Sequence, residues 1–143
     1  MNGRILCLDY GSKTVGVAVT DGLGLTAVSL ETIRREKENH LRATYRRISE
    51  LIAEYKVIRI VVGLPVNMDG REGERAALAR DFASELTKKT GIETVMQDER
   101  LTSVEASEIL HLTGNKKSNS GDRIDAVAAA IILTDYLNQH IDK

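Results

Sequence analysis

The stretch ILCLDYGSKTVGVAVTD, residues 5–21, decides the fold of this chain. An apolar run of strand length leads into Asp9, a turn containing Gly11 follows, and a second run rich in β-branched residues continues to Thr20. This pattern predicts a β-hairpin. Asp9 then stands where the first strand leaves the sheet, which is where open α/β sheets place their sites. An acid here can also serve only as a turn residue, and the stretch alone leaves both interpretations open.

The residues after the hairpin continue the antiparallel pairing and then alternate helix with strand. A turn at 22–24 and the apolar run 25–30 predict a third strand, and so an antiparallel meander. Later runs predict strands over 57–62, typical of a parallel central strand, and over 92–97. Apolar periodicity and end signals predict helices over about 36–55, 73–90, 102–114 and 122–138, with a polar loop over 114–121. The sequence therefore predicts an α/β fold: a mixed five-stranded sheet, three strands antiparallel and two parallel, flanked by helices.

Length and composition indicate an ordinary globular protein. The 143 residues are the usual size of one domain, so we expect a single domain over 1–143. No apolar run is long enough to cross a membrane and no export signal opens the sequence, so we expect a cytoplasmic protein. The three histidines and the single Cys7 have no zinc-ligand spacing. Aromatic residues are too scarce for a surface that reads unpaired bases by stacking.

Three acids stand at the ends of predicted elements: Asp9 and Glu99 after strands, and Asp125 in the first turn of the last helix. Parallel strands open toward one edge of a sheet, so these carboxylates can converge there. Clustered carboxylate oxygens suit Mg²⁺ or Mn²⁺, which support in-line phosphoryl transfer. Asp98 alternates in facing with Glu99, and the pattern does not choose between them. Asp125 can also merely complement the helix dipole beside a capping Asp122.

A run of basic residues precedes and enters the predicted helix at 36–55. The formal net charge of the chain is -1, so a surface that binds a polyanion must come from local clustering of this kind. The run is either a solvated helix face or a patch that contacts phosphates, and the sequence leaves both open. Its members are Arg34, Arg35, Lys37, Arg42, Arg46 and Arg47.

Four motifs in order resemble the YqgF family of Holliday junction resolvase-like proteins, also described as pre-16S ribosomal RNA nucleases. They lie at 9–21, 63–70, 98–102 and 125–133, and the resemblance extends over essentially the whole chain. It implies a ribonuclease H-like fold and a metal-dependent nuclease site in which Asp9, Glu99 and Asp125 match the acidic positions. It also implies a role in maturing the 5′ end of the small-subunit ribosomal RNA, with ribosomal particles as partners.

Four basic residues are candidates for holding the nucleic acid. Lys13 stands where the family commonly has Arg, and it keeps the charge without the bidentate geometry. Arg100, beside the acidic site, and Lys116 and Lys117, in the polar loop, are the other candidates for holding the scissile strand. The two loop lysines can instead be simply solvated.

Other function classes share parts of this pattern. Resolution of branched DNA, as by a Holliday junction resolvase, would require a symmetric homodimer to cut two strands, whereas trimming one RNA end can be done by a monomer. The opening motif also resembles the phosphate-binding hairpin of actin-like kinases and ATPases, but those proteins need two such lobes and this chain supplies one. A third class is a non-catalytic nucleic-acid-binding or ribosome-assembly module, against which the complete acidic trio argues.

Overall fold

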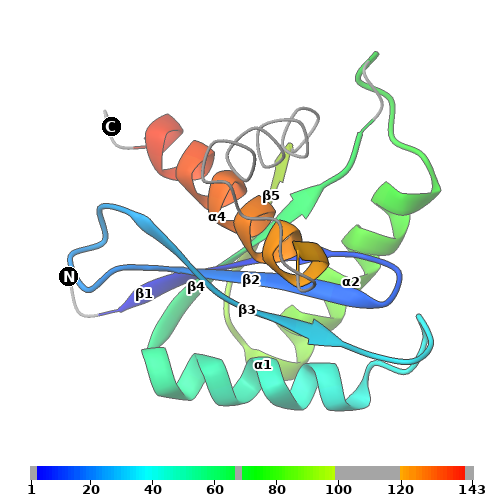
Figure 1. Ribbon diagram of the computed structural model, residues 1–143, viewed down its shortest axis with the longest axis horizontal. Helices are drawn as coiled ribbons and strands as arrows, with labels where there is room; N and C mark the ends of the chain where they lie inside the picture. Colours follow the sequence, from blue (N-terminus) through cyan, green and yellow to red (C-terminus); the bar gives the residue numbers. More distant parts are fainter. Residues whose placement is uncertain (1–2, 67–68, 99–119, 141–143) are drawn as a thin grey trace.

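The computed structural model describes residues 3–66, 69–98 and 120–140, whose strands form one mixed sheet with helices on both faces (Figure 1). Across the sheet the strand order is β3-β2-β1-β4-β5. The pairs β1/β2 and β2/β3 are antiparallel, whereas β4 pairs parallel with both β1 and β5. The predicted meander with two parallel strands is therefore confirmed. The elements are β1 (Arg4–Tyr10), β2 (Thr14–Thr20), β3 (Ala27–Arg34), α1 (Arg42–Tyr55), β4 (Val57–Leu64), α2 (Glu74–Thr90), β5 (Thr94–Asp98) and α4 (Ser120–His140).

Two hydrophobic cores lie on opposite faces of the sheet, because successive side chains of a strand point to opposite faces. Leu6 and Leu8 of β1 are fully buried in the core that includes Phe82 and other residues of α1 and α2. Cys7 lies between them in sequence and is buried in the other core, with Ile132 and neighbouring residues of α4. Figure 1 shows α4 crossing one face of the sheet while α1 lies beyond the other. The side on which a β1 residue lies therefore follows from its position along the strand.

The third strand and the first helix begin later in the chain than predicted. The Asp21 carboxylate accepts hydrogen bonds from the amides of Leu23 and Leu25, so Leu25 belongs to the turn and β3 starts at Ala27. At its other end β3 stays paired with β2 through Arg34, which stands opposite Thr14. Residues 35–41 then turn instead of beginning the helix at about 36, and α1 starts at Arg42. The helix predicted from the apolar periodicity is present, but the residues before Arg42 belong to β3 and to the turns that follow it.

The other boundaries follow the expected signals closely. β4 continues through Leu64 and ends immediately before Pro65, which lacks an amide donor. Gly91 caps α2 in the left-handed conformation, with its amide bonded to the carbonyl of Thr87 at 2.9 Å. The last helix begins at Ser120, within the predicted polar loop, and the predicted helix at 102–114 lies outside the described residues. Within the described ranges, no helix combines the length and apolar character needed to span a bilayer.

Candidate active site

Asp9 lies near the carboxyl end of β1 on the face of the sheet that α4 covers. Its neighbours along the strand, Leu8 and Tyr10, pack in the core of α1 and α2, whereas Cys7 packs beneath α4. Alternation therefore puts the half-buried Asp9 side chain on the same face as Cys7. Across the hairpin, Asp9 is paired with Gly16 of β2. This position at a strand end agrees with the sequence prediction.

Gly16 brings Asp125 to the neighbourhood of Asp9. A Cβ atom built on Gly16 would collide with the backbone carbonyl of Asp125 and would lie 3.2 Å from the amide nitrogen of Ala126. The backbone of α4 therefore rests directly on the residue that is paired with Asp9. The Asp125 side chain is half-buried at this approach. Two of the three acids singled out in the sequence thus come from distant parts of the chain to adjacent positions on one sheet face.

The third acid of the predicted cluster was expected just after the end of β5. β5 pairs parallel with β4, which pairs parallel with β1, so the three carboxyl ends share one edge of the sheet. Met96 belongs to the core of α1 and α2 and Val95 packs against the core of α4, so alternation puts the exposed Asp98 on the face opposite Asp9. Glu99 lies outside the described residues. Among the described residues, no group of three His, Cys, Asp or Glu side chains has a metal-binding arrangement.

The predicted substrate-binding cations fall partly inside the described chain. Lys13 is exposed at the tip of the β1–β2 hairpin, where the amide of Gly11 donates to the carbonyl of Thr14 at 2.7 Å. The carbonyl of Lys13 accepts a hydrogen bond from the amide of Arg35 at 2.9 Å, which ties the hairpin tip to the end of β3. Arg100, Lys116 and Lys117 lie outside the described residues.

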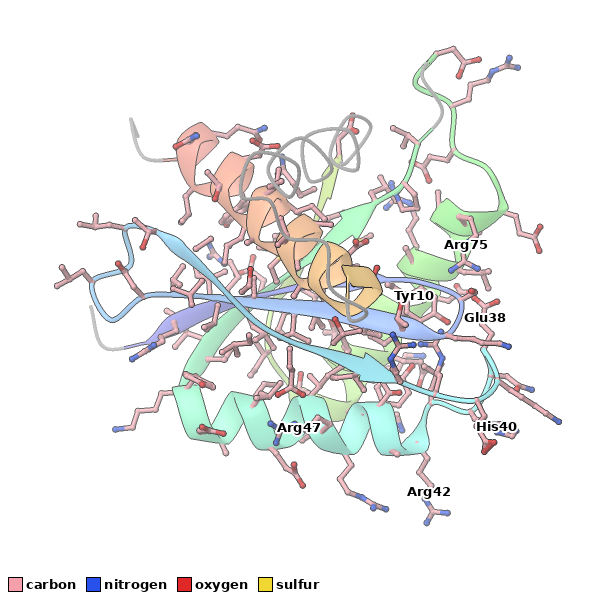
Figure 2. All side chains as sticks on the ribbon, viewed as in Figure 1. Tyr10, Glu38, His40, Arg42, Arg47 and Arg75 are labelled. Carbon is pink, nitrogen blue, oxygen red and sulfur yellow. The ribbon has the colours of Figure 1, made fainter. Side chains whose placement is uncertain are left out.

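Sequence reasoning missed a group of side chains that contacts the end of β1 and the turn of the hairpin. Arg35 donates one hydrogen bond to the carbonyl of Gly11 at 2.6 Å and another to that of Glu38 at 3.0 Å. Its guanidinium carbon lies 4.8 Å from the ring centroid of Tyr10, and that of Arg75 lies 5.7 Å from the same centroid. Arg75 also forms an ion pair with Glu38 at 2.7 Å. Figure 2 shows Tyr10, Glu38 and Arg75 gathered at this end of the sheet.

Tyr10, the centre of this group, is buried and packed against another aromatic ring. Burial raises the pKa of the Tyr10 phenol above its ordinary value of 10.0, although Arg35 and Arg75 oppose the shift. The Tyr10 ring also stacks on Phe82 at 4.5 Å between centroids. The residue that follows Asp9 is therefore fixed from several sides. Only the basic character of 34–35 was visible in the sequence, because the partners of Arg35 on the hairpin are 24 positions away along the chain.

Comparison with known proteins identifies the family. A family model described as "RuvX: Holliday junction resolvase" matches residues 3–139. The chain belongs to the RuvX family. A protein of Lachnospira eligens named "Putative pre-16S rRNA nuclease" is 50% identical over 134 residues, which cover 94% of this chain and 96% of that protein. A protein of the same name from Lactococcus lactis subsp. cremoris is 44% identical over 98% of this chain and 97% of its own length. RuvX is a nuclease family, so the resemblance found in the sequence is confirmed.

Solved structures support the fold of this RuvX-family chain. The structure of Thermus thermophilus RuvC matches with a TM-score of 0.57 at 14% identity, over 95% of each chain. The fowlpox virus Holliday junction resolvase matches with a TM-score of 0.55 at 11% identity, over 95% of this chain and 98% of the viral one. At these identities the likeness concerns the fold alone. The fold is ribonuclease H-like, as predicted.

Proposed function

We propose that this chain is a divalent-metal-dependent nuclease that hydrolyses phosphodiester bonds in the 5′-end maturation of precursor 16S ribosomal RNA. The observation that carries the proposal is the approach of α4 to the hairpin, which brings Asp125 beside the strand pair formed by Asp9 and Gly16. Close relatives named as pre-16S rRNA nucleases support the choice of RNA. We further propose that residues 1–143 act as one domain, in the cytoplasm, on RNA within ribosomal particles.

Asp9, Glu99 and Asp125 are the proposed catalytic residues and metal ligands. Carboxylate oxygens are the donors that Mg²⁺ and Mn²⁺ prefer, and the half-buried Asp9 and Asp125 supply them from one face of the sheet. Asp98 ends β5 at the edge where the parallel strands end and faces away from Asp9, which supports the next residue in the sequence, Glu99, as the third ligand. When bound, such a metal would supply activation of a water molecule and neutralisation of the charge on the attacking and leaving oxygens.

Cations around this site are proposed to hold the substrate strand. Lys13 is exposed at the tip of the hairpin whose first strand carries Asp9, and we assign to it a contact with a phosphate near the cleaved bond. We assign similar contacts to Arg100, Lys116 and Lys117 from their positions in the sequence. Each contact is electrostatic and independent of base identity, so these residues would position the strand without selecting its sequence.

Resolution of four-way DNA junctions is the second candidate activity. The description of the family model and the fold of the solved resolvases favour it. Cutting a junction symmetrically requires two active sites related by a two-fold axis, hence a homodimer, whereas trimming one RNA end requires only a monomer.

The two candidates differ in the substrate that is cut. Wild-type protein is incubated with Mg²⁺ or Mn²⁺ and either an end-labelled precursor RNA containing the small-subunit 5′ leader or an end-labelled four-way DNA junction. We expect metal-dependent cleavage of the RNA and little cleavage of the junction. Paired symmetric nicks in the junction, with intact RNA, would replace the RNA proposal by junction resolution. Failure to cut either substrate, free or within a precursor ribosomal particle, would contradict nuclease activity.

A further inference from the structure

Among the basic side chains of the described residues, two groups stand out that the sequence did not separate. In one group, five arginines each form an ion pair with a carboxylate. Arg47 contacts Glu31 at 2.7 Å and Glu50 at 2.9 Å, so the member of the basic run nearest the middle of α1 is part of an ion-pair network. The other neutralised arginines pair as Arg59–Glu93, Arg71–Asp69, Arg75–Glu38 and Arg80–Glu72. These side chains have their charge satisfied within the molecule.

Lys37, Arg42 and Arg46 form the second group. All three are exposed, and none has an ion pair or side-chain hydrogen bond within the part of the chain that the structure describes. Arg42 and Arg46 are four residues apart on α1 and so share one face of the helix. The first turn of α1 contains no acidic residue that could neutralise them. Three unneutralised positive charges are thus concentrated between the end of β3 and the first two turns of α1.

Hydrogen bonds fix this segment beside the hairpin that carries Asp9. The amide of Arg35 donates to the carbonyl of Lys13, and the Arg35 side chain donates to Gly11. The turn continues with a bond from the amide of His40 to the carbonyl of Lys37 at 3.0 Å. Figure 2 shows His40 and Arg42 at the same end of the molecule as Tyr10 and Glu38. The unneutralised charges therefore continue from the hairpin tip onto the start of α1.

Lys13 joins this segment to the acidic site. It lies three residues from Gly16, the partner of Asp9, a path of about 10 Å at about 3.3 Å per strand residue. A nucleic-acid strand bound at Asp9 on one face of the sheet can therefore pass Lys13 at the end of the sheet. It can then continue toward α1 on the other face.

We propose that Lys37, Arg42 and Arg46 form a phosphate track that binds the backbone of a nucleic-acid strand beyond the cleavage site, with Lys13 as the link. This inference rests on the proposed nuclease function, because it takes Asp9 as the point where the strand is cut. The track would bind the charged backbone and would not distinguish the bases. The nearby aromatic rings of Tyr10, Tyr45 and Phe82 stack on one another and so do not offer a surface on which bases could stack. Each phosphate contact on a single strand adds about 0.7 to the slope of log affinity against log salt.

The test compares two variants that lose the same charge. The track variant carries Lys37→Gln, Arg42→Gln and Arg46→Gln. The control carries Arg71→Gln, Arg80→Gln and Lys88→Gln, which remove three cations that are ion-paired on the surface. Binding of a fluorescein-labelled 12-nucleotide single-stranded RNA is measured by anisotropy in EDTA from 50 to 200 mM salt. The track variant should bind more weakly, with a slope shallower by about 2, whereas the control should match wild type.

Two results would overturn the track: equal slopes for the track variant and the control, or no RNA binding by the wild type. Thermal unfolding of both variants checks that the exposed substitutions leave the fold intact. The binding result is independent of cleavage. A track-dependent slope in a protein that cuts no RNA would leave the track in place and reject the nuclease, whereas cleavage with equal slopes would reject only the track.

Discussion

At the scale of single residues, Gly16 determines how closely the two acids approach. A glycine in the interior of a strand usually destabilises the strand, and it often marks a place where another backbone segment comes close. Here the other backbone is that of α4 at Asp125, which occupies the space that a Cβ atom would need. Because Gly16 is paired with Asp9, this contact sets the position of one acid relative to the other.

Replacing Gly16 with Ala should therefore affect both stability and catalysis. The added methyl group meets backbone atoms that cannot rotate away, so α4 must shift, at a cost of about 1–3 kcal/mol in the free energy of unfolding. The displaced Asp125 should lower the cleavage rate more than it weakens RNA binding. Urea unfolding and single-turnover cleavage measure the two effects, with Gly73→Ala as control because that position has open space. A Gly16→Ala protein with wild-type stability would contradict the close approach.

The residues also differ in how far the sequence could predict them. Asp9 was predictable because a local pattern, an apolar strand followed by a turn, marks where the strand leaves the sheet. The roles of Arg35 and Arg75 were not, because their contacts with Gly11, Tyr10 and Glu38 join segments that are distant along the chain. Likewise, the sequence could not separate the neutralised Arg47 from the unneutralised Arg42, since the carboxylate of Glu31 comes from another strand.

At the scale of elements, the turn between β2 and β3 is organised by one carboxylate. Asp21 accepts hydrogen bonds from the amides of Leu23 at 3.2 Å and Leu25 at 3.0 Å, and from the hydroxyl of Thr26 at 2.8 Å. The bond from the Leu25 amide, followed by that from Thr26, lowers the pKa of Asp21 below its ordinary value of 3.8. The ionised carboxylate thus holds the residues up to Thr26 in the turn, and β3 starts after them, at Ala27.

Asp21→Asn should destabilise the protein in a pH-dependent way. A lowered pKa in the folded state means that the carboxylate contributes stability above pH 3.8, and that this contribution is lost as the pH falls through the lowered value. The urea midpoint of the variant should lie below that of wild type at pH 7, and the gap should close toward pH 3. Asp81→Asn, an exposed acid on α2, is the control. A gap of constant size across this pH range would contradict the role of the charge.

Element boundaries were harder to predict than the elements themselves. Periodicity correctly indicated a helix ending near Tyr55, but it could not show that pairing with β2 extends β3 through Arg34. The apolar character of Leu25 resembled the start of a strand, whereas the side chain of Asp21 binds it into the turn. In both cases a hydrogen bond to a preceding segment outweighed the local pattern.

At the scale of the whole molecule, sheet topology assembles the candidate site. The parallel pairing of β1, β4 and β5 brings their carboxyl ends to one edge of the sheet, as the sequence suggested. The helix α4 crosses the face of the sheet on which Asp9 lies (Figure 1). The sequence could not predict that crossing, because nothing in α4 alone specifies where it meets β2. The sequence likewise could not show that Asp98 faces away from Asp9, because this depends on which core each face of β5 packs against.

Asp9 and Asp125 are proposed to serve one metal-dependent nuclease site. The most direct measurement is the single-turnover cleavage rate of precursor RNA against Mg²⁺ or Mn²⁺ concentration, for wild type, Asp9→Asn, Asp125→Asn and the control Asp81→Asn. We predict metal-dependent cleavage by wild type and the control. Each site variant should lose about 1000-fold in rate, corresponding to several kcal/mol of transition-state stabilisation, while keeping its fold and RNA binding. Near wild-type cleavage by Asp9→Asn at every metal concentration would contradict the account.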